Sequence, residues 1–296
     1  MPITRAARRT GAAAVVLLTC GLVACSANSA PDGAGSGQSQ SVEAPSEGFR
    51  DLAAIKASGN IKIGVFYDKA PFGSQDENGK FVGYDIFYGE RVAKDLAVEV
   101  QWVPVEAASR VAFLESGKVD LILANFTVTA ERAEKVDFAN PYLKVSLGVA
   151  SPAEAEITDL AQLEGKDVIV VKGTTAETYL EKNNPELKLT KFDQYTEATS
   201  ALLDGRAAAW VTDNTEALAW TLHNPGFVTG ITSLGPADTI AGAVTKGNTT
   251  LLTWLNQQLV ELGEEDFFHK DYEETLKPVY GDAVSPDELV VEGGQA

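Results

Sequence analysis

The chain has little sulfur and few histidines. It contains two cysteines, Cys20 and Cys25, both within the first 25 of its 296 residues, and one methionine, Met1. These counts exclude a metal site built on cysteine and a disulfide framework in the body of the chain. The two histidines, His223 and His269, lie far apart in the sequence, so we expect each to be a surface or helix-end residue and not a metal ligand.

Positive charge is also scarce. Lys and Arg together number 24 against 42 Asp and Glu, which gives a net charge of −18. A nucleic-acid-binding protein needs a basic surface to neutralise phosphates, so this balance argues against nucleic acid as a partner. Neither a Gly-x-Gly-x-x-Gly fingerprint nor a phosphate-loop Lys-Ser/Thr motif occurs, and we expect no cofactor and no metal.

The N-terminus has the features of an export signal. Arg5, Arg8 and Arg9 precede residues 11–24, an apolar run without a charge that is too short to span a bilayer about 30 Å thick. Together they predict a secretory signal peptide over residues 1–24. The Arg8-Arg9 pair leaves twin-arginine export open beside the general secretory route.

The apolar run ends in Leu22-Val23-Ala24-Cys25, which resembles a bacterial lipobox, whose cysteine is lipidated and becomes the first residue of the mature protein. We therefore expect a lipid on Cys25 to hold the protein at the extracellular face of the cell membrane. A secreted protein without lipid is the alternative. Residues 25–48 are rich in Ser, Gly, Ala, Gln and Pro and predict a flexible tether before a folded body that begins near Phe49.

Strand and helix patterns alternate along the body, in two series. The first series predicts strands at 61–66, 98–103 and 119–126, with helices at 85–96 and 109–116. The second predicts strands at 167–171, 187–192 and 207–212, with helices at 174–181 and 196–203. Such alternation indicates an α/β fold with parallel sheets.

A set of short motifs is spread along the body: 64–66, 70–73, 79–86, 117–122, 127–132, 137–142, 172–176 and 212–215. Through these motifs, residues 49–296 resemble the family 3 extracellular solute-binding proteins, the polar-amino-acid receptors of ATP-driven importers. Residues 105–111, 123–127 and 267–270 make the resemblance strongest to the cysteine-binding surface lipoproteins. One departure is Phe87, where the family usually has Asp or Glu at a position that faces structure and not ligand, so we expect function to be unaffected.

The resemblance implies a two-lobed periplasmic-binding-protein-like fold of type II, in which two hinge strands join the lobes and ligand is held between them. Apolar segments with a glycine suit hinge strands. The boundaries it predicts are lobe 1 at 49–147 plus 243–296, lobe 2 at 148–242, and hinge strands at 147–150 and 240–243.

A free amino acid presents an α-carboxylate and an α-ammonium, and a closed cleft must replace the water around both. Arg132 follows a predicted strand and a loop that holds Asn125 and Thr127. Family members similarly use this arginine for the carboxylate, so the resemblance assigns all three residues to the ligand site. An exposed Arg132 that pairs with Glu131 or Glu134 is the alternative.

Thr174 and Thr175 lie between a strand and a helix, where N–H groups and hydroxyls form an anion site at the helix N-terminus. Ordinary N-capping by Thr174 is the alternative. Asp213 ends a predicted strand and is well placed to take the ammonium, with helix capping as the alternative. We see no other acid that the motifs would place in the cleft.

Lys69 and Arg110 are predicted to face the ligand's side chain, and Phe66 is assigned to the same site. Relatives that bind basic amino acids present aromatic rings at two positions. This chain has Lys69 at the first position and Ala107 at the second, and Arg110 follows Ala107 by three residues. Two cations disfavour a Lys or Arg ligand through repulsion and suit a small polar, thiol or acidic side chain. Surface ion pairs made by the two cations are the alternative.

The predicted function is that of an extracellular substrate-binding lipoprotein of an amino-acid ABC importer, which passes a free L-amino acid to the transmembrane permease subunits. Cysteine is favoured, and aspartate, glutamate and glutamine stay open. A tethered sensor or adhesin is the alternative from another class. Some relatives dehydrate cyclic acids, but no Ser-His-Asp pattern or nucleophilic cysteine occurs, so we expect a monomeric binding protein and not an enzyme.

Overall fold

The computed structural model describes residues 48–295 of the chain. The predicted signal peptide, the predicted lipidation site Cys25 and the tether up to residue 47 lie outside these residues. Within residues 48–295, no helix is both long and apolar enough to cross a membrane.

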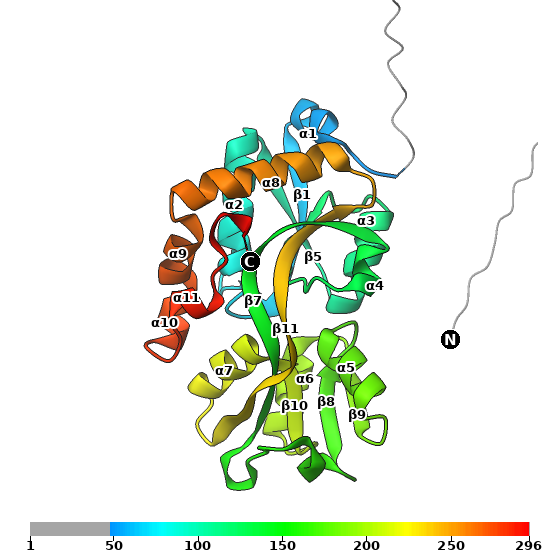
Figure 1. Ribbon diagram of the computed structural model, residues 1–296, viewed down its shortest axis with the longest axis vertical. Coiled ribbons are helices and arrows are strands. Elements are labelled where there is room, and N and C mark those ends of the chain that lie inside the picture. The colour runs from blue at the N-terminus through cyan, green and yellow to red at the C-terminus, as the bar shows by residue number, and fades with distance from the viewer. Residues whose placement is uncertain (1–47, 296) are drawn as a thin grey trace, which may run out of the picture. The chain divides into compact units, whose positions relative to one another are not determined.

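The main sheet has eight strands in the order β5-β1-β6-β11-β7-β10-β8-β9. Strands β1, β5 and β6 belong to one lobe and β8, β9 and β10 to the other, while β7 and β11 pass through both (Figure 1). The α/β fold and its two lobes are therefore as predicted. The bounds are β1 Asn60–Val65, β5 Glu99–Pro104, β6 Leu121–Ile122, β7 Val136–Pro152, β8 Asp167–Val171, β9 Lys188–Phe192, β10 Ala209–Asp213 and β11 Phe227–Thr245.

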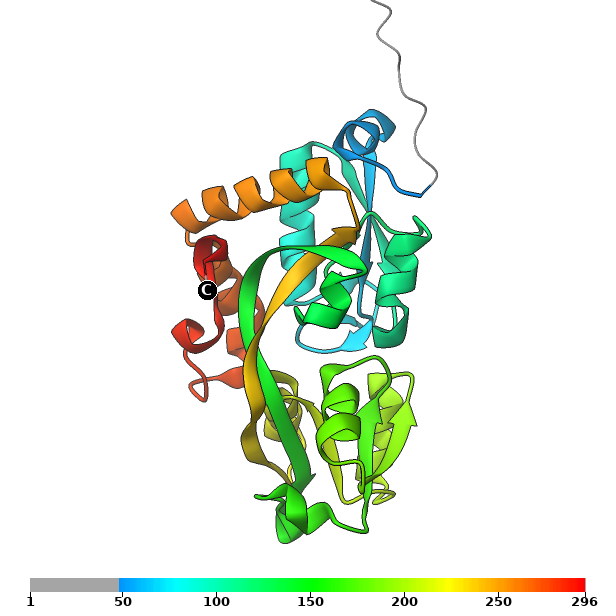
Figure 2. The same cartoon turned by 45° about the vertical axis from the view of Figure 1, so that its right-hand side comes forward.

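The two long strands correct the prediction of purely parallel sheets. Strands β5, β1 and β6 are parallel, as are β9, β8 and β10, but β7 and β11 are antiparallel to each other and to their neighbours. The chain crosses to the second lobe in β7 and returns in β11, so the two crossings run in opposite directions (Figure 2). The predicted hinge residues 147–150 and 240–243 lie within these strands.

Strand β6 is shorter than the predicted strand 119–126. It ends after Ile122, although the apolar run continues, because Asn125 adopts a left-handed backbone conformation with φ of 41° that no strand can contain. The side-chain Oδ2 of Asp85 accepts a hydrogen bond of 2.8 Å from the backbone N of Asn125. This bond turns the chain out of the sheet at the point where the predicted site begins.

Helices of the first lobe enclose a core rich in aromatic rings. Helix α2 begins after Gly83 and buries Tyr84 and Tyr88, and the rings of Tyr142 and Phe268 stack at 5.6 Å between centroids. Phe87 packs on Phe267 at 5.4 Å, which is a structural role for the departure from the family pattern. The helices are α1 Leu52–Ser58, α2 Tyr84–Leu96, α3 Arg110–Glu115, α4 Ala130–Ala133, α8 Thr249–Glu264, α9 Phe267–Asp271, α10 Lys277–Tyr280 and α11 Pro286–Leu289.

The second lobe places α5 Thr175–Asn183, α6 Tyr195–Leu203 and α7 Asn214–His223 around strands β8 to β10. Four of the five residues of β8 are buried, as expected for a strand covered on both faces. Helices α5 and α7 begin where β8 and β10 end, so both helix N-termini and Asp213 meet at one edge of the sheet.

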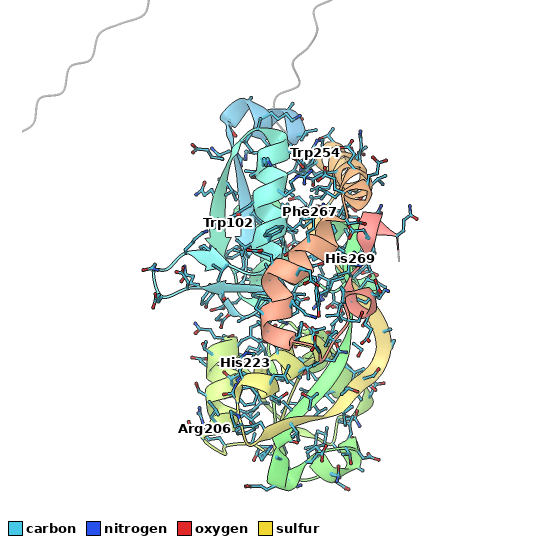
Figure 3. All side chains as sticks on the ribbon, turned by 90° about the vertical axis from the view of Figure 1, so that its left-hand side faces the viewer. Trp102, Arg206, His223, Trp254, Phe267 and His269 are labelled. Atoms are coloured by element: carbon cyan, nitrogen blue, oxygen red, sulfur yellow. The ribbon has the colours of Figure 1, made fainter. Side chains whose placement is uncertain are left out.

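A small second sheet was not predicted. Its strands, β2 Asp68–Lys69, β3 Gly73–Gln75 and β4 Phe81–Val82, are too short to show a period in the sequence. The 3₁₀ helix η1, Ala107–Ser109, leads into α3. The two histidines lie apart, near the ends of α7 and α9, as expected (Figure 3).

Candidate functional site

A cavity of about 610 Å³ is lined by residues from both lobes and from the crossing strands. From the first lobe it is lined by Ala107, Ala108, Val111, Phe126, Thr129, Glu131, Arg132 and Lys135, and from the second by Gly173, Thr175, Thr178, Tyr179, Lys182 and Asn183. The crossing strands contribute Leu147, Leu234, Pro236 and Asp238. Of the predicted site residues, Arg132 and Thr175 are among those that line the cavity, and the others are not.

Arg132 lines the first-lobe wall of the cavity, and Arg110 shares the Gly173 carbonyl with it; both arginines are held by backbone carbonyls. Arg132 donates from Nη1 to the carbonyl of Thr127 at 2.8 Å and from Nη2 to that of Gly173 at 2.9 Å. Arg110 is 3% exposed and donates to the carbonyls of Ala107, Ala124 and Gly173 at 2.9 to 3.1 Å. In the part of the chain that the structure describes, Arg132 pairs with neither Glu131 nor Glu134, so that alternative is wrong.

Burial disfavours the charged form of both arginines and so lowers their pKa. It lowers the pKa of Arg132 to about 9, and the positive charge of neighbouring Arg110 lowers it further. Burial also lowers the pKa of Arg110, against the attraction of Tyr195 and Asp213. An anion bound in the cavity beside Arg132 would stabilise the charged form of these guanidinium groups and so offset the hydration that they lose on burial.

Aromatic rings support the two guanidinium groups. The Cζ atoms of Arg110 and Arg132 lie 4.3 and 4.8 Å from the centroid of the Phe126 ring. Phe66 is fully buried, lies 5.4 Å from the Cζ of Arg110, and meets Tyr195 edge-on at 5.3 Å. Phe66 therefore holds the cations in place from behind, and does not line the cavity.

The loop between β8 and α5 closes the other side. Gly173 has φ of +75° and presents its carbonyl to both arginines, while its N–H donates to Glu177 Oε2 at 2.6 Å. Thr174 caps α5, accepting from the backbone N of Glu177 at 3.3 Å and donating to the Val171 carbonyl at 2.7 Å. The capping alternative for Thr174 is thus correct, and the N-terminus of α5 still faces the cavity through Thr175.

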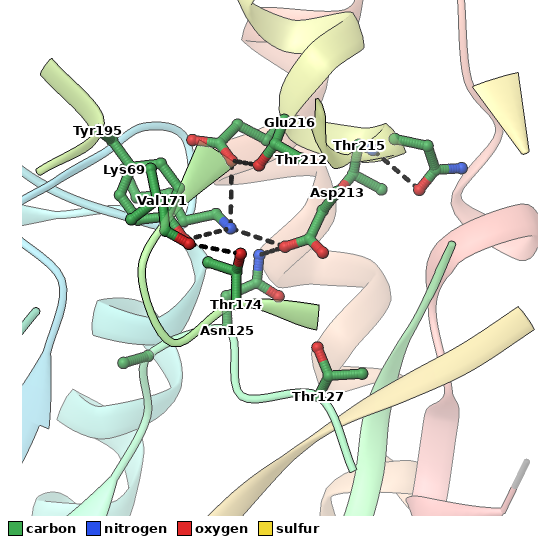
Figure 4. Close-up of polar contacts among 12 residues, drawn as sticks. Lys69, Asn125, Thr127, Val171, Thr174, Tyr195, Thr212, Asp213, Thr215 and Glu216 are labelled. Carbon is green, nitrogen blue, oxygen red and sulfur yellow. Dashed lines mark hydrogen bonds and ion pairs between the residues drawn. The ribbon is translucent and has the colours of Figure 1, made fainter. Parts of the chain in front are cut away.

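Lys69 is the centre of a buried polar cluster that joins the lobes (Figure 4). Its Nζ lies 2.7 Å from Asp213 Oδ2, 3.2 Å from Glu216 Oε2 and 3.2 Å from the hydroxyl of Tyr195. An ammonium has three N–H donors, and here three acceptors surround it. Lys69 is 2% exposed, so the alternative that Lys69 and Arg110 make surface ion pairs is wrong.

Two acids share the charge of Lys69. Burial alone would lower the pKa of Lys69, but the carboxylates of Asp213 and Glu216 outweigh it and raise that pKa well above its usual value. Burial raises the pKa of Glu216 to about 7, against the attraction of Lys69 and a hydrogen bond of 2.5 Å from Thr212 Oγ1.

The expectation of no acid in the cleft besides Asp213 is wrong, because Glu131 and Asp238 line the cavity and Glu216 lies beside Asp213 at Lys69. Glu216 was also missed from the sequence. It lies in the first turn of α7, three residues after Asp213, and is 3% exposed. Side chains three residues apart share a helix face, so this spacing was a usable signal. Tyr195 carried no comparable signal, because its hydroxyl reaches Lys69 only through the packing of the two lobes.

Asp213 and Asn125 are in contact with each other and are not among the residues that line the cavity. Asp213 occupies the N-cap position of α7 but makes no side-chain capping bond, so the capping alternative is wrong. Among the described residues its contacts all go to Oδ2, from Lys69 and from Asn125 Nδ2 at 3.4 Å. The buried Oδ1 of Asn125 has no hydrogen-bond partner there. Both remaining oxygens suit an incoming N–H donor.

Asp85 positions Asn125 from behind the site. It is fully buried, accepts from the Tyr142 hydroxyl at 2.5 Å and from the Asn125 backbone N, and burial raises its pKa to about 6 against these hydrogen bonds. Within residues 48–295, no group of three or more His, Cys, Asp and Glu side chains is arranged to hold a metal ion.

Comparison with known proteins agrees with this arrangement. The sequence matches the bacterial extracellular solute-binding proteins, family 3, over residues 61–276. The ABC transporter glutamine-binding protein GlnH of Bacillus subtilis is 30% identical over 242 residues, which are 79% of this chain and 88% of that protein.

Two solved structures resemble the chain at higher identity. A solute receptor for L-cysteine from Neisseria gonorrhoeae is 51% identical with a TM-score of 0.81, covering 82% of this chain and all of that one. The cysteine-binding protein from Campylobacter jejuni is 50% identical with a TM-score of 0.80, covering 81% of this chain and 98% of that one.

Proposed function

Because the chain belongs to the bacterial extracellular solute-binding proteins of family 3, we propose that it captures one free L-amino acid between its lobes and passes it to the permease of an ABC importer. Its ligand is a small, polar, uncharged amino acid, with cysteine favoured. Aspartate, glutamate and glutamine are the alternatives within the same transporter class.

One observation carries the proposal. Arg132 lines the cavity with no carboxylate partner among residues 48–295, while Asp213 and Asn125, which are not among the lining residues, each keep one side-chain oxygen without a hydrogen-bond partner in that part of the chain. A free amino acid carries a negative and a positive charge on neighbouring groups, and an unpaired guanidinium and unpaired acceptors can serve these two charges. In this assignment Arg132 and the N-terminus of α5 take the carboxylate, and Asp213 with Asn125 takes the ammonium.

The charges around the side-chain position favour cysteine over the basic amino acids. Lys69 and Arg110 are both buried there, and a Lys or Arg side chain would bring a third cation beside them. Cysteine also fits the two relatives at about half identity, whose names give cysteine as the ligand. The mature chain would have no cysteine except Cys25, so a captured thiol would find no partner for a mixed disulfide in the body of the chain.

An enzyme is the less favoured reading, although Glu216 is a carboxyl group that titrates near neutrality. A general acid must reach the substrate, and Glu216 is 3% exposed and held by an ion pair with Lys69 and a hydrogen bond from Thr212. A tethered sensor or adhesin would use the same cleft and differs only in what happens after the ligand is bound.

The same proposal includes the arrangement of the chain at the cell surface. Cys25 carries a lipid after removal of residues 1–24, and residues 25–48 hold the body away from the outer face of the membrane. Lobe 1 comprises 49–147 plus 243–296 and lobe 2 comprises 148–242, and they close on hinge strands at 147–150 and 240–243. The protein works as a monomer.

Ligand analogues test the proposal. We expect calorimetry under reducing conditions to show one site for L-cysteine, weaker binding of L-serine, and no binding of N-acetylcysteine or cysteine amide, each of which lacks one of the two charges. Arg132→Lys keeps the charge but loses the planar donor pair, so it should bind less tightly than the unchanged protein. Tight binding of N-acetylcysteine would contradict the role of Asp213.

A further inference from the structure

Lys69 reaches from the first lobe into a ring of acceptors that all belong to the second. Asp213, Glu216 and Tyr195 lie 2.7, 3.2 and 3.2 Å from its Nζ, and Lys69 and Glu216 are 2% and 3% exposed. Lys69 Nζ donates hydrogen bonds to Asp213 and Tyr195 and forms an ion pair with Glu216. Lys69 is not among the residues that line the cavity, contrary to what the sequence suggested.

The two carboxylates beside Lys69, Asp213 and Glu216, have different partners once a ligand is bound. In the proposed function, the ammonium of the amino acid is neutralised by Asp213. The carboxylate that then remains for Lys69 is Glu216, which is fixed by the 2.5 Å hydrogen bond from Thr212 Oγ1. Neither Glu216 nor Lys69 is among the residues that line the cavity, so Glu216 acts on a ligand through the balance of charge around Lys69 and Asp213 and not by contact.

We propose that Glu216 is the positioning residue that sets the charge selectivity of the site, by neutralising Lys69 so that the pocket takes an uncharged side chain in preference to a carboxylate. This inference rests on the proposed function, since it assumes that the ammonium of an amino acid occupies Asp213. Without the charge of Glu216, the ammonium of Lys69 becomes a partner for an acidic side chain.

Glutamine at position 216 is the matched change, because it has nearly the shape of Glu216 and its carbonyl can still accept from Thr212 Oγ1. We measure the dissociation constants of L-cysteine and L-aspartate with the full mature chain under reducing conditions at about pH 7.5. At that pH most of Glu216 is ionised and most of the cysteine thiol is protonated. The readout is the ratio of the two constants, which a general loss of stability does not change.

We expect Glu216→Gln to shift this ratio toward aspartate by about tenfold or more, the effect of one buried charge pair. Thr212→Val removes the hydroxyl whose hydrogen bond lowers the pKa of Glu216, so it should shift the ratio in the same direction as Glu216→Gln but by less. The double variant Lys69→Met with Glu216→Gln removes both charges and should return the ratio toward its original value. An unchanged ratio in Glu216→Gln would overturn the inference.

A second variant keeps the inference testable if Glu216→Gln fails to fold. Lys69→Met leaves the charge of Glu216 without a cation, so it should bind L-arginine relative to L-cysteine at least tenfold better than the unchanged protein does. No gain for arginine would overturn the inference. Failure of the proposed function itself is separate, because then the unchanged protein would bind neither cysteine nor aspartate in the same titrations.

Discussion

The contact of Gly173 with the first lobe gives a sharp test of how the cleft closes. A Cβ atom added to Gly173 would lie 2.5 Å from the Cα and 2.7 Å from the N of Ala108. Both are backbone atoms of the 3₁₀ helix η1, so no side-chain rotation can make room. Gly173→Ala should therefore oppose the approach of the two lobes.

The expected loss follows from the hydrogen bonds that this approach allows. Restoring ordinary contact distances of about 3.5 Å requires a separation of about 1 Å. That displacement would lengthen the bonds of 2.9 and 3.1 Å from Arg132 and Arg110 to the Gly173 carbonyl beyond hydrogen-bond range. Two bonds from charged donors are worth about 1.5–3 kcal/mol each. Their sum is about 3–6 kcal/mol, or roughly 150-fold or more in affinity.

Gly205→Ala is the matched control. Gly205 also has a positive φ, +68°, but nothing lies within 4 Å of an added Cβ. Left-handed backbone costs alanine about 1–2 kcal/mol, so both variants should lose stability by that amount in urea denaturation. Calorimetry with L-cysteine should show weaker binding for Gly173→Ala alone. Equal affinity in the two variants would refute the closure argument, because backbone strain alone would then explain the result.

Four further predictions concern single residues. Arg132→Ala and Asp213→Ala should each weaken every amino-acid ligand by about 30-fold or more in calorimetry, since each leaves a buried charge of the ligand without its partner. Asp68 Oδ2 accepts from the backbone N of Tyr195 at 2.8 Å across the lobes, so Asp68→Ala should lower affinity by about three- to tenfold. Burial raises the pKa of Glu216 from 4.5 to about 7, so the folded protein binds the extra proton between these values. The stabilisation that this extra proton gives is present below pH 4.5 and is lost by about pH 7. Urea denaturation should therefore show that the free energy of unfolding falls by roughly 1–3 kcal/mol over this range, and Glu216→Gln should not show this fall. Cys25→Ser should release the protein from washed membranes without changing its affinity, and retention of the variant there would rule out Cys25 as the anchor.

Local elements of the fold could be predicted because their signals are local. The helix predicted at 85–96 is α2, and the strand predicted at 167–171 is β8, since side-chain periodicity and apolar runs reflect burial within one element. The length of β7 and β11 could not be predicted, because their pairing joins residues about 100 positions apart and contains register shifts. The early end of β6 depends on Asp85, which reaches Asn125 only in the folded chain.

The functional site could likewise be predicted only in part from the sequence. The motifs indicated that Arg132 and Asp213 serve the cleft; the structure places Arg132 in the cavity lining, while Asp213 is paired with Lys69 and is not among the lining residues. The partners of Lys69 could not be predicted, because Asp213 and Glu216 lie in the other lobe and are more than 140 residues away. The carbonyl of Gly173 could not be predicted as the acceptor for both arginines, since every residue has such a carbonyl and only tertiary packing selects one.

Direct titration of the mature protein tests the central claim, that the cleft takes one small, uncharged, polar amino acid. The panel is cysteine, cystine, serine, aspartate, glutamate, glutamine, histidine and arginine, with reductant in every titration except that of cystine. The account predicts one binding site per chain, with cysteine bound most tightly and arginine most weakly. Absence of binding to every member, or tightest binding of arginine, would contradict it.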